Sequence, residues 1–145
     1  MKKSLLVGLA LMVAVAGGTS TAAAGQDVPG VVSSSIQPVS WDGWLAAKAK
    51  AEEKDAAGNY VAALQYYLEY VRQAQGLNSP ARVAWGKNNA AYMIIKMHRQ
   101  DPTVDLSPAA KLLEEGLAVE GATEDCRKVI ETNLLHVRSS LGRTY

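Results

Sequence analysis

Few side chains in this sequence are of the types that carry out covalent or metal chemistry. Cysteine occurs once, at Cys126, and histidine twice, at His98 and His136. A nucleophilic cysteine needs a base beside it and access to solvent. Cys126 instead precedes Val129 and Ile130 by three and four residues, a spacing that places it on the apolar face of a helix. Neither histidine has the H-E-x-x-H spacing or a similar metal-binding pattern. We therefore expect Cys126 to be buried, and we expect neither a catalytic site nor a metal site.

The acidic residues give the same answer. They occur as adjacent pairs, at 52–53, 114–115 and 124–125. Adjacent residues on a helix do not share a face, so such pairs are poorly placed for joint acid and base catalysis. Gly-rich phosphate loops and the G-x-S-x-G motif of serine hydrolases are also absent from the sequence. We expect a protein that is not an enzyme and that uses no cofactor.

Composition narrows the class of protein. The chain has 145 residues, of which 48% are apolar and 20% charged. This is the composition of one globular domain rather than of a disordered chain. The formal net charge is +1, so no basic field favours nucleic acid.

The first 24 residues have the pattern of a bacterial secretory signal peptide. Lys2 and Lys3 are followed by the uncharged run Leu5–Ala16 and then by Ala22–Ala24, which fits the A-x-A cleavage motif before Gly25. A spanning helix needs about 20 apolar residues, more than this run contains. We therefore expect cleavage near Ala24, a periplasmic or secreted protein, and no stable membrane span afterwards. Cleavage removes two lysines and no acid, so the net charge becomes −1.

The rest of the chain divides into a leader and a helical domain. Residues 25–39 contain Gly, Pro and three consecutive Ser residues without helical periodicity, which predicts a flexible leader. Residues 40–145 form a single all-α domain in this interpretation, because no segment alternates with the period of a strand. The expected helices are about 41–57, 60–75, 80–99, 108–119 and 124–141.

Capping residues set these boundaries. Ser79 and Ser107 each stand before a proline, and Thr123 stands before two acids, so we expect all three to cap helix N-termini. Gly76 is expected to end the second helix as its C′ residue, because glycine tolerates a left-handed backbone.

The string GNYVAALQYYLEY at 58–70 resembles the second half of a tetratricopeptide repeat, a helix–turn–helix unit of about 34 residues. The residues that match the family pattern are Gly58, Asn59, Tyr60, Ala63 and Tyr67. The resemblance implies an antiparallel array of about two repeats plus a C-terminal capping helix. In that array Ala63 lies at a close helix crossing, opposite the small residue Ala51 of the first helix. A second, more degenerate unit is centred on Ala91 and Ala110. The alternative is an unrelated five-helix bundle.

The resemblance also implies a binding surface. In tetratricopeptide domains the first helices of the repeats line a concave groove, and an Asn at the place of Asn89 commonly hydrogen-bonds the backbone of an extended peptide. The residues carried over onto this groove are Lys48, Glu52, Trp85, Asn88, Asn89, Tyr92, Lys96 and Asn133, with Val129 and His136 beside Asn133. The same residues are ordinary interhelix contacts in the alternative interpretation.

A second candidate surface lies on the second helix. Tyr66 and Tyr70 stand beside its apolar stripe and, with Trp41 and Trp44, form either an exposed aromatic patch or part of a helix that is buried on both sides.

These observations support two functions of different kinds. The first is a non-enzymatic adaptor or scaffold of the cell envelope that binds a segment of another envelope or secreted protein. The second is a structural module that associates with itself as a homodimer. A small helical-bundle enzyme or ligand-binding protein is a weaker third interpretation, since the sequence shows no catalytic pattern.

Overall fold

The computed structural model describes residues 36–142. The predicted signal peptide, its cleavage site and residues 25–35 of the predicted leader lie outside the described part of the chain, as do residues 143–145.

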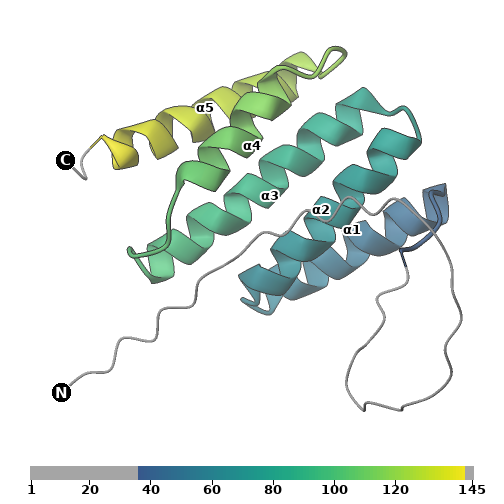
Figure 1. Ribbon diagram of the computed structural model, residues 1–145, viewed down its shortest axis with the longest axis horizontal. Coiled ribbons are helices and arrows are strands. Elements are labelled where there is room, and N and C mark those ends of the chain that lie inside the picture. The colour runs from purple at the N-terminus through teal and green to yellow at the C-terminus, as the bar shows by residue number, and fades with distance from the viewer. Residues whose placement is uncertain (1–35, 143–145) are drawn as a thin grey trace, which may run out of the picture. The chain divides into compact units, whose positions relative to one another are not determined.

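The described residues form five α-helices (Figure 1), which confirms the all-α prediction. Their bounds are α1 Trp41–Ala56, α2 Tyr60–Gly76, α3 Pro80–Gln100, α4 Ser107–Leu117 and α5 Glu124–Leu141.

Polar side chains start three of the helices. The hydroxyl of Ser40 accepts a hydrogen bond from the Gly43 N–H at 2.9 Å and starts α1. The side-chain oxygen of Asn59 starts α2 by accepting the Ala62 N–H at 3.2 Å. Thr123 caps α5, as predicted. Each such bond satisfies an N–H that has no partner within its own helix.

Three predicted boundary roles differ from the structure in detail. Ser79 is the N-cap residue of α3, as predicted, but its side chain makes no capping hydrogen bond. Ser107 is already helical, and its N–H donates to the carboxylate of Asp105 at 2.9 Å, which ends the preceding loop. Gly76 is the last residue of α2, while the left-handed residue of the following turn is Asn78, with φ 52°. Asparagine adopts the left-handed backbone region more readily than most residues, so Asn78 has the role that the sequence suggested for Gly76.

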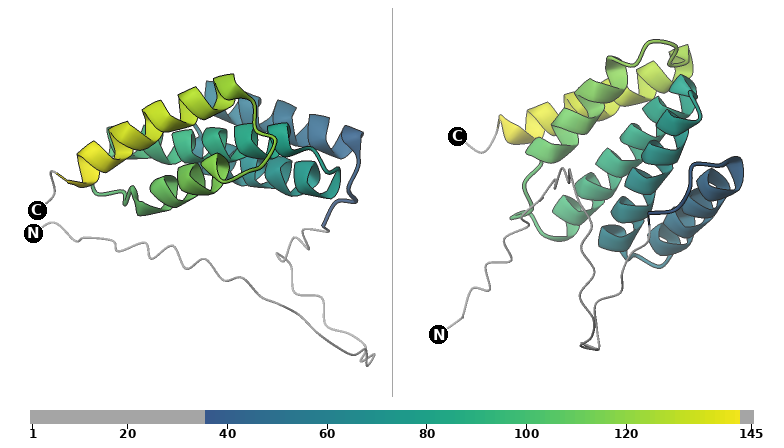
Figure 2. Two further views of the ribbon diagram at one scale, coloured as in Figure 1. Left: turned by 90° about the horizontal axis from the view of Figure 1, so that it is seen from above. Right: turned by 45° about the vertical axis from the view of Figure 1, so that its right-hand side comes forward.

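The helices form a sequential array in which each packs against its neighbour in the chain, and α3 also packs against α5. In Figure 2 (left), α1 and α5 lie above, whereas α2 and α4 lie below. α3 packs against α5, whereas α1 packs mainly against α2 and reaches α3 through the ion pair of Asp55 with Lys96.

The core has an aliphatic part and a part rich in small residues. Large side chains of α3, α4 and α5, among them Ile95, Leu113 and Ile130, are essentially inaccessible to solvent and form one cluster. At the crossing of α1, α2 and α3 three fully buried alanines, Ala51, Ala63 and Ala90, pack with the buried side chains of Tyr67 and Met93. Ala63 and Ala51 are thus buried together in one cluster between helices.

None of the five described helices is both long enough and apolar enough to cross a membrane.

Candidate functional site

Four of the predicted groove residues share one face of α3. Trp85, Asn89, Tyr92 and Lys96 are spaced four, three and four residues apart, and all four are half-buried. This is the spacing of side chains on one face of a helix. We call these four residues the α3 stripe. Its two aromatic rings also pack against the core, so only part of each is open to a partner.

Asn88 does not belong to this surface, and its predicted place in the groove is wrong. Its side chain is only 4% exposed and lies between α3 and α5. The side-chain N–H of Asn133 donates to Asn88 Oδ1 at 2.9 Å, and Asn88 Nδ2 donates to Asn89 Oδ1 at 3.4 Å. A buried amide needs hydrogen-bond partners, and Asn88 has them in Asn133 of α5 and in the adjacent Asn89.

The hydrogen bonds from Asn133 to Asn88 and from Asn88 to Asn89 determine which group of Asn89 is available to a ligand. Because Asn89 Oδ1 accepts from Asn88, the remaining group of the side chain is its Nδ2 donor, which makes no hydrogen bond to any described residue. A donor in this position suits a ligand that brings an acceptor, such as a peptide carbonyl.

The other end of the α3 stripe is cationic and aromatic. Lys96 Nζ lies 2.6 Å from Asp55 Oδ1 and 5.3 and 5.2 Å from the ring centres of Tyr60 and Tyr92. The Arg99 guanidinium lies 5.6 Å from the Tyr92 ring centre. The contact between Lys96 and Asp55 ties α3 to α1, and the cations over the Tyr92 ring hold its orientation.

The predicted residues of α1 mainly contact each other. Lys48 Nζ and Glu52 Oε1 are 2.8 Å apart, one turn apart on the helix, and their side chains are 44% and 55% exposed. An exposed pair of this kind contributes little to stability. Both residues therefore remain accessible at the edge of the face.

A shallow hollow of about 220 Å³ lies on α5, lined by Lys128, Val129, Thr132 and Asn133. It includes one predicted groove residue, Asn133, whose amide reaches Asn88 on α3. A second hollow, of about 320 Å³, lies around the α2–α3 turn and Val119 and contains none of the predicted residues.

The residues whose types could carry out chemistry, Cys126 and His98, have structural roles. Cys126 is fully buried, as predicted, and burial raises the pKa of its thiol, which keeps it protonated. His98 Nδ1 donates to the carbonyl oxygen of Val104 at 2.8 Å and fastens the α3–α4 loop. Among residues 36–142 no group of three or more His, Cys, Asp or Glu side chains is placed to hold a metal ion.

The candidate aromatic patch of α1 and α2 is divided: Tyr70 is buried, Trp44 and Tyr66 are half-buried, and Trp41 is exposed. Tyr70 is 5% exposed, and its ring centre lies 5.1 Å from that of Trp44. Burial raises the pKa of the Tyr70 phenol. The Arg82 guanidinium lies 4.9 Å from the ring centre of Trp41. Of the two alternatives for this face, the buried helix is correct for Tyr70, because α1 and α3 both cover α2.

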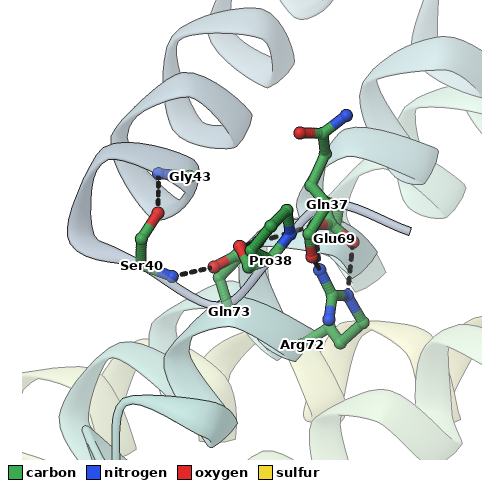
Figure 3. Close-up of polar contacts among 7 residues, drawn as sticks. All are labelled: Gln37, Pro38, Ser40, Gly43, Glu69, Arg72 and Gln73. Atoms are coloured by element: carbon green, nitrogen blue, oxygen red, sulfur yellow. Dashed lines mark hydrogen bonds and ion pairs between the residues drawn. The ribbon is translucent and has the colours of Figure 1, made fainter. Parts of the chain in front are cut away.

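Sequence reasoning missed one polar site altogether, which Figure 3 shows. Gln73 on α2 is fully buried. Its side-chain oxygen accepts the Ser40 N–H at 2.9 Å, and its side-chain N–H donates to the carbonyl oxygen of Pro38 at 2.9 Å. Arg72 donates to the carbonyl oxygen of Gln37. The chain before α1 is therefore held on α2 from Gln37 onward, three residues before the expected start of the domain.

Two glycines and one ion pair complete this site. A Cβ at Gly76 would lie 2.7 Å from Val39, and one at Gly43 would lie 2.9 Å from Gln73, so neither position accommodates a side chain without a shift. The bidentate contact of Arg72 lowers the pKa of the Glu69 carboxyl, which also accepts from Gln73. The sequence shows both glycines, but only the packing explains why a side chain does not fit at either position. Gly76 is also the last residue of α2, and that role alone does not reveal its contact with Val39.

No family model, curated protein or solved structure matches the chain.

Proposed function

We propose that this chain is a non-enzymatic interaction module that binds an extended segment of another protein across the α3 stripe. The observation that supports it most directly concerns Asn89, which lies between the half-buried side chains of Trp85 and Tyr92 on the α3 stripe. Its Oδ1 accepts from Asn88, and its Nδ2 donor has no partner among the described residues. Aromatic anchors with a polar group of fixed orientation are the usual composition of a protein interface.

The neighbouring groups favour a particular partner chemistry. Asn89 supplies a hydrogen-bond donor, and the half-buried rings of Trp85 and Tyr92 on either side of it supply apolar contact. A segment that presents a backbone carbonyl next to an apolar or aromatic side chain matches both features. The tetratricopeptide resemblance of residues 58–70 supports the same assignment, since that family binds extended segments on this face.

We further propose that the module works in the bacterial cell envelope, either in the periplasm or after secretion. The support is the pattern of Lys2, Lys3, the apolar run and the A-x-A motif before Gly25. Amino-terminal sequencing of the protein from its native host tests this assignment. A bulk protein that still begins at Met1 contradicts it.

Photo-cross-linking tests the binding surface. A photoreactive amino acid at Glu52, on the exposed edge of the face, is expected to capture a partner segment in the native envelope. The same amino acid at Val61, which is 54% exposed on α2, is the matched control and is expected to capture none.

With the captured segment as ligand, the contribution of each residue of the α3 stripe to affinity can be measured. We expect Tyr92→Ala to reduce affinity by roughly thirtyfold, since truncating a central aromatic anchor costs about 2 kcal/mol or more. Asn89→Ala removes one neutral hydrogen bond and is expected to cost about 1 kcal/mol. Titration is combined with circular dichroism. Unchanged affinity in both folded variants would place the interface elsewhere.

A specific observation also favours the second function, self-association. It is Leu135 on the outer side of α5, which is 70% exposed.

A further inference from the structure

α5 is the last helix of the described array and packs mainly on α3 and α4. Its inner side buries Cys126, Ile130 and Val137. On its outer side Leu135 is 70% exposed, more than any other large apolar side chain in the five helices. Helical arrays usually present a polar outer face on their terminal helix, so this leucine needs an explanation.

The hollow of about 220 Å³ lies beside this leucine on the same helix. Thr132, which lines the hollow, precedes Leu135 by three residues, so the two side chains are neighbours on the helix surface. The face therefore carries a protruding leucine and a recess about one turn apart. A second α5, antiparallel to the first around a two-fold axis near Thr132, places each Leu135 over the other copy's recess.

The charges of α5 favour the same antiparallel orientation. Its first turn carries Glu124 and Asp125, and its last turn carries Arg138. Within the chain Arg138 pairs with Glu114 and Glu124 lies near Lys128, but both pairs are exposed and therefore weak. Antiparallel pairing sets the acidic turn of one copy near the basic turn of the other, and it opposes the two helix dipoles. A parallel pairing would place like charges together.

We propose that this chain forms a symmetric dimer through the outer face of α5, with Leu135 of each copy seated in the hollow of the other. A face that matches itself under a two-fold axis gives a closed assembly of two. The 18 residues of α5 span about 27 Å. One helix pair of that length is smaller than a standard interface of about 1,600 Å², so the dimer is weak and depends on concentration.

Sedimentation equilibrium on the purified protein, from about 10 μM to about 1 mM, tests the proposal. We expect the mass to rise from one chain toward two across this range. Leu135→Glu is expected to weaken association at least tenfold. Because Leu135 is mostly exposed, this variant is expected to keep its melting temperature.

Leu45→Glu is the matched control, since it makes the same change at a 53% exposed leucine on α1. It is expected to dimerise like the unmodified protein. A protein that stays monomeric throughout, an equal loss in both variants, or growth beyond two chains would each overturn the proposal. The last outcome would indicate head-to-tail contacts between α5 and another face.

A covalent test locates the axis. In Thr132→Cys, mild oxidation is expected to link two copies, because the axis passes near this position. Cys126 is fully buried and so stays outside the reaction. Val61→Cys, on the exposed face of α2, is expected to link far less. Equal linking of the two variants would contradict the geometry. Tyr92→Ala is expected to leave dimerisation unchanged, so this proposal stands or fails separately from the peptide-binding surface.

Discussion

In the half of the array formed by α3, α4 and α5, large aliphatic side chains fill the space between helices, whereas α1 is joined to α2 and α3 through small residues, one aromatic contact and polar contacts. Ile130 and Leu113 represent the first kind of packing and are fully buried. Ala51 and Ala63 represent the second. In addition, the Trp44 ring of α1 packs on Tyr70, Asp55 pairs with Lys96, and Gln73 bonds the backbone of the chain before the helix.

The difference shows two ways of attaching a helix to a core. A helix with large apolar residues is stabilised by the area it removes from water. α1 buries little more than Ala47 and Ala51 fully, so close approach and directional bonds must position it. The first kind of packing is sensitive to lost volume and the second to added volume or a lost bond. Three substitutions separate them.

Ile130→Ala is expected to have the largest effect. It leaves a cavity between α4 and α5, where Gly116 closely faces the isoleucine, and it is expected to lower the free energy of unfolding by about 2–5 kcal/mol. Urea denaturation measures this change. Ile130→Val, as the milder control, is expected to cost about 1 kcal/mol. If both variants unfold like the parent, the aliphatic half does not depend on this packing.

Ala63→Leu tests the small-residue crossing by adding volume. Ala63 is fully buried against α1 and α3, so the larger side chain must push the helices apart, at a cost of about 1–3 kcal/mol. Thermal melting followed by circular dichroism measures the loss. Ala46→Leu, at an exposed position of α1, is expected to be nearly neutral. Neutral behaviour of Ala63→Leu would contradict the close crossing and the repeat-like assignment of residues 58–70.

Gln73→Ala is expected to have the smallest effect, about 1 kcal/mol, because it removes bonds to a segment that water can reach. The local effect is larger than the global one. Hydrogen exchange is expected to become faster at the Ser40 amide and in the first turn of α1. Gln75→Ala, an exposed change on the same helix, is expected to alter neither. Unchanged exchange in Gln73→Ala would show that Gln73 does not hold the segment.

Much of the fold could be predicted because its signals are local. Helical periodicity and good helix formers placed all five helices within two residues of their observed bounds. Thr123 was recognised as a cap because an N-cap acts within one turn. Cys126 and Ala63 were placed in the core by their spacing from neighbouring apolar residues. The predicted roles of Ser107 and Gly76 differ from the structure because they depend on contacts with Asp105 and Val39. The helical pattern of the sequence contains no information on these contacts.

The sequence by itself determined which segments are helical, where most of them end and which face of each is apolar, since these properties depend on residues within a turn or two. Only the tertiary structure decided the roles of the polar side chains. Asn88 is buried because Asn133, 45 residues away, comes within hydrogen-bond distance. Gln73 is buried because the chain before α1 folds back over α2. A polar side chain is buried or exposed according to whether a partner reaches it in space, and the chain's local pattern does not contain that information.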